Sequence, residues 1–170
     1  MKWEEKTVLV TGGNGFLGTA VINELEKKSP KKIISPSSKE IDLRINSNCK
    51  KVVQNVDIII HLAGKGGGIG IMKEKPAEIF YDNIMISTQL IHEANCSNVE
   101  KFVALGTVCS YPKFSPIPFT EENIWDGYPE ETNAAYGLSK KMMMVQSEAY
   151  RQQFGFRSIN IIPTNLYGPN

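Results

Sequence analysis

The stretch TVLVTGGNGFLG, residues 7–18, decides the fold of this chain. Its first part, Thr7–Val10, is a short β-branched run typical of a strand. A helical pattern follows from Phe16 to about Lys28. Between strand and helix, three glycines recur at intervals of three residues, at Gly12, Gly15 and Gly18. A glycine turn can be merely flexible, but this spacing in this context predicts a strand, a tight phosphate-binding turn and a helix.

Each of the three glycines has a separate expected use. Gly12 allows the tight turn, Gly15 lets the backbone approach a pyrophosphate, and Gly18 lets the helix lie close to the strand. The helix amino terminus adds unpaired N–H donors and a positive dipole, both of which favour phosphate. We therefore predict a dinucleotide site whose first segment contains Gly12, Asn14, Gly15, Phe16, Leu17 and Gly18.

The rest of the chain alternates predicted strands and helices. Further strands are expected at 32–34, 41–43, 56–62, 102–105 and 158–162, and helices at 49–55, 76–94 and 134–154. Residues 64–70 and 111–132 are expected to form loops, the second on the surface. This order predicts an α/β fold, a Rossmann-type doubly wound parallel sheet with helices on both faces, forming one dinucleotide-binding domain over residues 1–170.

Composition narrows the class of partner. The 170 residues carry a formal net charge of +1, and no basic patch with interleaved aromatics indicates nucleic-acid binding. No apolar run is long enough to cross a membrane, and Met1–Lys6 lacks the features of a signal peptide. Three cysteines without metal-type spacing predict reduced thiols in a cytoplasmic protein and no metal site. Because the chain stops at Asn170 directly after a strand and a turn, we expect it to be the first part of a longer protein.

The segment after the second strand bears on the choice of cofactor. NAD-binding proteins usually place an Asp or Glu there, whereas this chain has Ser37, Ser38 and Lys39. Two hydroxyls and an ammonium suit a 2′-phosphate, so NADP (NADPH) is favoured. Glu40 is near enough to leave NAD possible. The alternative without a function is a loop that is simply solvated. Asp42 either meets the adenine amino group or caps a turn.

A tyrosine and a lysine supply the candidate chemistry. Tyr136 and Lys140 are four residues apart on a predicted helix, so both side chains lie on one face. An ammonium beside a phenol favours the phenolate, which predicts a lowered pKa for Tyr136 and proton exchange with a carbonyl or alcohol oxygen. The pair is common by itself, and it becomes a strong signal in combination with the glycine loop.

Together, residues 11–18, 61–64, Thr107 and 136–140 resemble the extended short-chain dehydrogenase/reductase family, the NAD-dependent epimerases and dehydratases of nucleotide sugars. The resemblance implies that Thr107 bonds the substrate oxygen and that Lys140 also holds the nicotinamide ribose. It implies further cofactor contacts from Tyr136 and from Leu62, Ala63 and Gly64. His61 is expected to pack beneath the cofactor, and His92 to lie on the outer side of a helix.

Three shorter motifs, KGGGI (65–69), CSYPK (109–113) and PTNLYGP (163–169), are similar to family members that epimerise and reduce a GDP-4-keto-6-deoxymannose sugar with NADPH. The resemblance implies an acid/base role for Cys109, whose alternative is a buried structural cysteine. It also implies that Pro163, Asn165 and Leu166 shape the nicotinamide end. Asn14 stands where such enzymes often have arginine, which weakens the NADP assignment.

The resemblance leaves the whole-protein function open between three alternatives. The chain belongs to an epimerase/reductase of this GDP-linked sugar, to another nucleotide-sugar epimerase, dehydratase or reductase, or to a noncatalytic dinucleotide-binding module. The resemblance further implies a homodimer formed through the helices at 76–94 and 134–154. A carboxyl-terminal substrate domain, with a second acid/base histidine, is expected to lie beyond Asn170.

Overall fold

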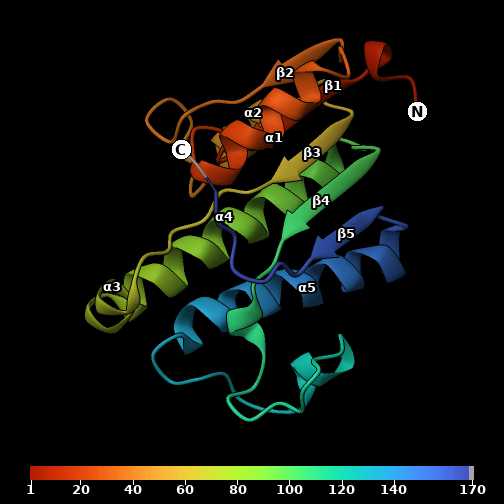
Figure 1. Ribbon diagram of the computed structural model, residues 1–170. Coiled ribbons are helices and arrows are strands. Elements are labelled where there is room, and N and C mark those ends of the chain that lie inside the picture. Colours follow the sequence, from red (N-terminus) through yellow and green to blue (C-terminus); the bar gives the residue numbers. More distant parts are fainter. Residues whose placement is uncertain (169–170) are drawn as a thin grey trace.

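The computed structural model describes residues 1–168 and is built around one five-stranded sheet (Figure 1). The strands are β1 (Thr7–Thr11), β2 (Lys32–Ile34), β3 (Ile58–His61), β4 (Lys101–Leu105) and β5 (Ser158–Ile161). They lie in the order β2-β1-β3-β4-β5, and every pairing is parallel. The chain builds outward in one direction from β1 to β2 and in the other from β3 onward, which places the topological switch point beside β1.

Helices cover both faces of this sheet (Figure 1). The covering helices are α1 (Phe16–Glu26), α2 (Asn46–Val52), α4 (Pro76–Cys96) and α5 (Ala134–Phe154), and a short helix, α3 (Ile69–Glu74), contacts α4. Side chains of α2, α4 and α5 form the larger core with Leu9, Ile59 and Phe102 of the sheet. On the other face, α1 packs Leu25 against Val8 and Val10. The predicted doubly wound architecture is confirmed.

Burial explains the position of the central strands. All five residues of β1 are buried, and so are three of the four in β3. A strand that is apolar on both faces is stable only between two covered faces, and β1 and β3 occupy that position. Within residues 1–168, none of the helices combines the length and the apolar character needed to cross a membrane.

The expected strand at 41–43 is wrong. This segment follows a single turn in which the N–H groups of Glu40 and Ile41 both donate to the Ser37 carbonyl. The carboxylate of Asp42 then accepts the N–H of Arg44 at 2.9 Å, which makes a second local turn. Because these donors are used within the segment, they do not form a ladder with a neighbouring strand.

Two connections contain more structure than expected. The glycine-rich segment after β3 ends in the short helix α3. The long connection between β4 and α5 contains the 3₁₀ turns η2 (Val108–Ser110) and η3 (Glu122–Trp125). There the rings of Tyr111 and Phe119 stack with centroids 4.7 Å apart, and Ile124 is buried with Tyr111 and Met144 of α5, so part of the predicted surface loop packs on α5.

Candidate active site

The glycine loop has the tight geometry that its spacing predicts. Gly12 has φ +72°, and a Cβ at this position would lie 2.8 Å from the backbone nitrogen of Ala63. A Cβ on Gly18 would lie 2.5 Å from Gly13 Cα and closer still to the Gly12 carbonyl oxygen, so helix α1 packs directly on the loop. The Gly15 N–H closes the turn on the Gly12 carbonyl at 3.0 Å.

The start of α1 is suited to an anion. Gly15 is the N-cap residue, its position provides no side-chain cap, and the first turn contains no acidic residue. A Cβ on Gly15 would meet only the Gly12 carbonyl oxygen, at 3.2 Å, so little else restricts approach to this backbone. Unpaired N–H groups at the end of an eleven-residue helix therefore fit the pyrophosphate of a dinucleotide.

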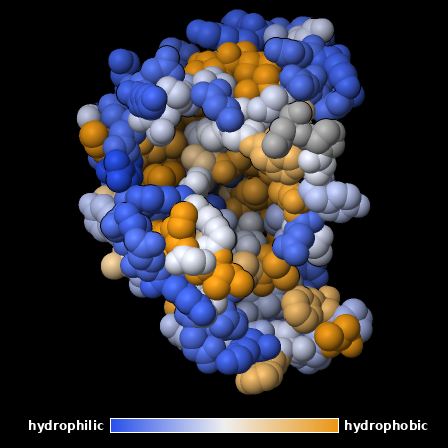
Figure 2. Space-filling view, turned by 60° about the vertical axis from the view of Figure 1, so that its left-hand side comes forward, coloured by the Kyte–Doolittle hydropathy of each residue, from blue (hydrophilic) through white to orange (hydrophobic). Residues whose placement is uncertain are grey.

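A cavity of about 570 Å³ opens beside this loop. Figure 2 shows the molecule hollowed on the side where the strands end, with hydrophobic groups inside the hollow. The cavity is lined by Thr11, Gly12, Asn14, Gly15, Pro36, Ser37, Ser38, Ile41, Asp42, Leu43, Arg44, Leu62, Ala63, Gly64, Lys65, Asp82 and Ile86. These residues come from the loops after β1, β2 and β3 and from α4, at the edge of the sheet where ligands bind in this architecture.

Nine of the predicted cofactor residues line this cavity: Gly12, Asn14, Gly15, Ser37, Ser38, Asp42, Leu62, Ala63 and Gly64. Phe16, Leu17 and Gly18 form the first turn of α1 outside the lining, and Lys39 is exposed and also outside the lining. Pro163 lines a separate cavity of about 280 Å³ with Val108 and Tyr111. Asn165 and Leu166 are exposed, and the last residue of their motif, Pro169, lies outside the described residues.

Ser37 interacts with Glu40 in the segment after β2. One carboxylate oxygen of Glu40 accepts both the backbone N–H and the hydroxyl of Ser37, at 2.8 and 2.7 Å. These bonds hold the pKa of Glu40 below its ordinary value. The Ser37 hydroxyl, one of the two expected to meet a 2′-phosphate, is thus already donated to a carboxylate, and Ser38 is the exposed hydroxyl beside it.

Tyr136 and Lys140 are brought together on α5 as predicted. The Lys140 Nζ lies 6.0 Å from the centroid of the Tyr136 ring, and Lys140 is only 2% exposed. Burial lowers the pKa of the Lys140 ammonium to about 8. The pKa of Tyr136 is raised by burial, with a further contribution from Cys109, so the expected lowering by Lys140 is wrong. Desolvation of the phenolate outweighs the effect of an ammonium at this distance.

The loop after β3 joins this pair to the cavity. Gly64 lines the cavity, and a Cβ on it would lie 3.2 Å from Lys140 Nζ. A Cβ on Gly66 would lie 3.9 Å from the Tyr136 ring. A side chain larger than glycine at position 64 would press on the Lys140 ammonium at the cavity wall.

Thr107 and Cys109 belong to a turn that packs on the same helix. The Thr107 hydroxyl accepts the Cys109 N–H at 3.2 Å and so caps η2. Ser110 donates to the carbonyl of Gly137 at 2.8 Å, and a Cβ on Gly137 would overlap the Cys109 backbone. Glycine after Tyr136 therefore lets η2, which contains the half-buried Cys109, pack on α5 next to Tyr136.

Buried polar residues support the site from below. Asn83, 1% exposed, accepts the Lys65 N–H at 2.9 Å and donates to the carbonyls of Lys65 and Ile79 at 2.7 Å each. His61 is fully buried and hydrogen-bonded to Thr11 at 2.8 Å and Ser87 at 3.3 Å. Burial lowers the pKa of His61 to about 3, so the ring is neutral and its role is packing and hydrogen bonding.

Eight lining residues were not predicted as cofactor contacts: Thr11, Pro36, Ile41, Leu43, Arg44, Lys65, Asp82 and Ile86. Thr11 and Lys65 stand in motifs that the sequence does single out, but the other six follow no motif. Arg44 and Asp82 are 38 positions apart, and only the tertiary fold brings them together.

The sequence matches the NAD dependent epimerase/dehydratase family over residues 8–170. The chain belongs to this family. It is 31% identical over 169 residues to GDP-L-fucose synthase of Escherichia coli K12, covering 98% of this chain and 52% of that protein. The chain thus spans about half the length of the curated relatives it matches.

Solved structures agree with this membership. A GDP-L-fucose synthetase from Naegleria fowleri bound to NADP has a TM-score of 0.88 and 28% identity, with 98% of this chain and 52% of that chain covered. A GDP-mannoheptose C4 reductase from Campylobacter jejuni with NADP bound has a TM-score of 0.92 and 25% identity, with 96% and 52% covered. The family is NAD(P)-dependent, and its relatives include enzymes of GDP-linked sugars.

Proposed function

We propose that this chain is the dinucleotide-binding domain of an NADP-dependent epimerase/reductase that converts a GDP-4-keto-6-deoxymannose sugar to GDP-L-fucose. One observation carries the proposal: a buried lysine, which has its tyrosine partner on the same helix, adjoins Gly64 in the wall of the cavity beside the glycine loop. The similarity to GDP-L-fucose synthases supports the choice of sugar. The proposal includes a cytoplasmic location, which the cysteines favour, and a homodimer, which the family resemblance implies.

Different segments of the domain would bind different parts of the dinucleotide. The start of α1 would hold the pyrophosphate, and the segments of Ser37, Ser38 and Asp42 would hold the adenosine end. Leu62, Ala63 and Gly64 would lie along the dinucleotide, and Lys140 would bond the nicotinamide ribose. When bound, the reduced nicotinamide supplies the hydride for the C4 ketone.

The protonation states fit a reduction. Because burial raises the pKa of Tyr136, its phenol is protonated at neutral pH and is able to donate a proton to the oxygen of a ketone. Thr107 would orient that oxygen. Lys140 stays largely protonated at neutral pH, since its pKa is about 8, and it would stabilise the phenolate left after proton donation.

Cys109 would exchange protons at the carbons that flank the ketone. Its thiol is half-buried beside Tyr136, within the same part of the site. Epimerisation of a keto sugar needs an acid/base group at those carbons, because the ketone makes their protons removable. The Cys109 role therefore separates epimerisation from reduction, which depends on Tyr136.

The proposal is tested by incubating the protein that contains both this domain and the expected substrate domain with NADPH and GDP-4-keto-6-deoxymannose, and following the loss of absorbance of the reduced nicotinamide. Deuterium incorporation from heavy water at C3 and C5 is followed in parallel. We expect Tyr136→Phe to stop reduction and Cys109→Ser to stop deuterium incorporation. Turnover only with another GDP-linked keto sugar would change the substrate, and cofactor binding without any turnover would identify a noncatalytic module.

A further inference from the structure

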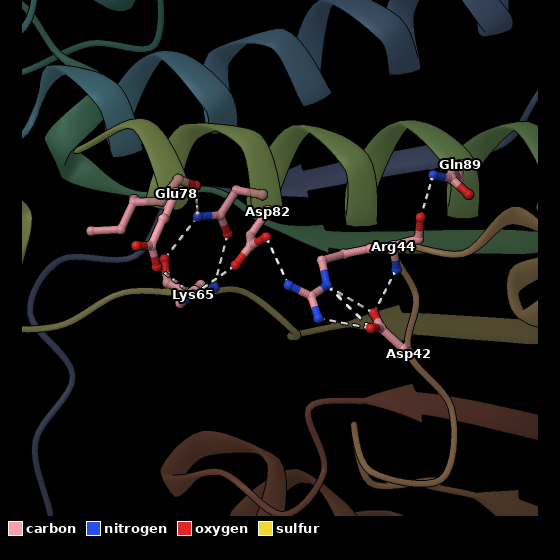
Figure 3. A network of polar contacts seen from close by, with 8 residues as sticks. Asp42, Arg44, Lys65, Glu78, Asp82 and Gln89 are labelled. Atoms are coloured by element: carbon pink, nitrogen blue, oxygen red, sulfur yellow. Dashed lines mark hydrogen bonds and ion pairs between the residues drawn. The ribbon is translucent and has the colours of Figure 1, made fainter. Parts of the chain in front are cut away.

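A chain of charged groups crosses one wall of the cavity (Figure 3). Asp82 of α4 is only 5% exposed, and its two carboxylate oxygens accept from Arg44 Nη1 at 3.0 Å and Lys65 Nζ at 2.8 Å. The two cations come from the loops after β2 and β3. Asp82 thus ties both loops to the helix that covers the sheet.

Arg44 continues the chain to Asp42. Its Nε donates to Asp42 at 3.0 Å and its Nη2 donates at 2.8 Å, so the guanidinium meets both carboxylate oxygens. The Arg44 carbonyl accepts from Gln89 of α4 at 2.8 Å, which holds the backbone as well. A planar guanidinium that is bonded through three of its nitrogens is held in one orientation, and its bonds in turn hold the Asp42 carboxylate in one orientation.

The position of Asp42 gives this arrangement a use. Asp42, Arg44 and Asp82 all line the cavity that receives the dinucleotide under the proposed function. Hydrogen bonds from Arg44 hold the pKa of Asp42 below its ordinary value, so the carboxylate is charged at neutral pH and accepts hydrogen bonds only. Burial opposes ionisation of Asp82, but the bonds from Lys65 and Arg44 leave its pKa lowered.

We propose that Asp82 is a positioning residue for recognition of the adenine base, because it fixes Arg44, which in turn aims the Asp42 carboxylate at the base amino group. The inference rests on the proposed dinucleotide function. A carboxylate distinguishes an amino group from a carbonyl oxygen, since only the amino group donates a hydrogen bond. The chain from Asp82 to Asp42 therefore determines which base the domain prefers.

Base preference is measured by fluorescence titration with NADH and with its inosine analogue, in which a carbonyl oxygen replaces the adenine amino group. NADPH and its inosine analogue serve if NADH binds too weakly. For the unaltered chain we expect the adenine cofactor to bind about tenfold more tightly or better, because the analogue leaves a charged acceptor facing an oxygen. The nicotinamide end is identical in both ligands, so the ratio reports on the base alone.

Asp82→Asn and Arg44→Lys are expected to reduce this preference to about threefold or less. Asparagine replaces one of the two accepting oxygens with an NH2 donor, which faces one of the two cations without bonding it. A lysine ammonium cannot meet both oxygens of Asp42 together with Asp82. Glu78→Gln is the matched control: Glu78 lies on the same helix, is exposed and bonds Lys65 at 3.4 Å, and the substitution is expected to leave the ratio unchanged.

The outcomes separate the inference from the proposed function. Equal loss of affinity for both ligands in the variants, with the ratio kept, would show a structural role and overturn the inference. An unaltered chain that binds both ligands equally would overturn it too, whereas an unaltered, folded chain that binds neither would overturn the proposed function. If Asp82→Asn fails to fold by circular dichroism, Arg44→Lys decides.

Discussion

Replacing Lys140 with methionine is expected to stabilise the fold while it destroys the proposed catalytic pair. Lys140 is 2% exposed, and burial lowers the pKa of its ammonium from 10.5 to about 8. The folded state therefore holds this proton less tightly than the unfolded chain does. At pH 7 the difference in pKa corresponds to about 3 kcal/mol of stability that the folded protein forgoes.

The effect has a defined dependence on pH. Below pH 8 both states are protonated and the whole penalty applies; as pH rises from 8 toward 10.5, the folded state loses the proton first and the penalty disappears. Methionine has an unbranched side chain that fits the space of the lysine stem, and it carries no charge. The gain from Lys140→Met should thus be about 3 kcal/mol at pH 7 and about 1 kcal/mol at pH 9.5.

Urea unfolding followed by circular dichroism at pH 7 and pH 9.5 measures both values. Lys113→Met is the control, because Lys113 is a half-exposed lysine paired with Glu131 at 2.8 Å on the surface. Its substitution should change stability much less than that of Lys140, because solvent screens an exposed ion pair. A Lys140→Met chain less stable than the unaltered chain at pH 7, or a gain independent of pH, would refute the reasoning.

Three further predictions follow from buried groups. Gly18→Ala should lower the free energy of unfolding by about 1–3 kcal/mol and abolish NADPH binding, because its Cβ would overlap loop backbone. Gly68→Ala is the control and should do neither, because a Cβ there would meet nothing within 4 Å. Equal melting temperatures of the two variants would contradict this. Because the folded pKa of His61 is about 3, the free energy of unfolding should fall by about 1.4 kcal/mol per unit as the pH is lowered from 6.5 toward 3. His61→Gln should reduce this slope, and equal slopes for the two chains in acid titrations would count against the prediction. Asn83→Ala should cost about 2–3 kcal/mol in urea unfolding, since it leaves the Lys65 backbone unpaired; an unchanged midpoint would exclude that role.

The features that the sequence predicts correctly depend on local pattern. The strand, glycine turn and helix of residues 7–18 follow from side-chain size and spacing within twelve residues, and all are present. The spacing of Tyr136 and Lys140 likewise places them together on α5. Periodicity and glycine geometry act over a few residues, so a single sequence reveals them.

The features that the sequence misses depend on side chains meeting across the fold. The segment at 41–43 has strand-like residues, but the bonds of Ser37 with Glu40 and of Asp42 with Arg44 bend it into turns. The phenol of Tyr136 has a raised pKa because of the depth of its burial, which spacing along the helix does not reveal.

The central claim, that this chain forms a dinucleotide site beside its glycine loop, is tested most directly by fluorescence titration of the purified chain with NADPH and, in parallel, NADH. The account predicts saturable binding of both, with NADPH bound more tightly, and loss of binding in Gly18→Ala. A chain that is folded by circular dichroism and binds neither cofactor would contradict the claim.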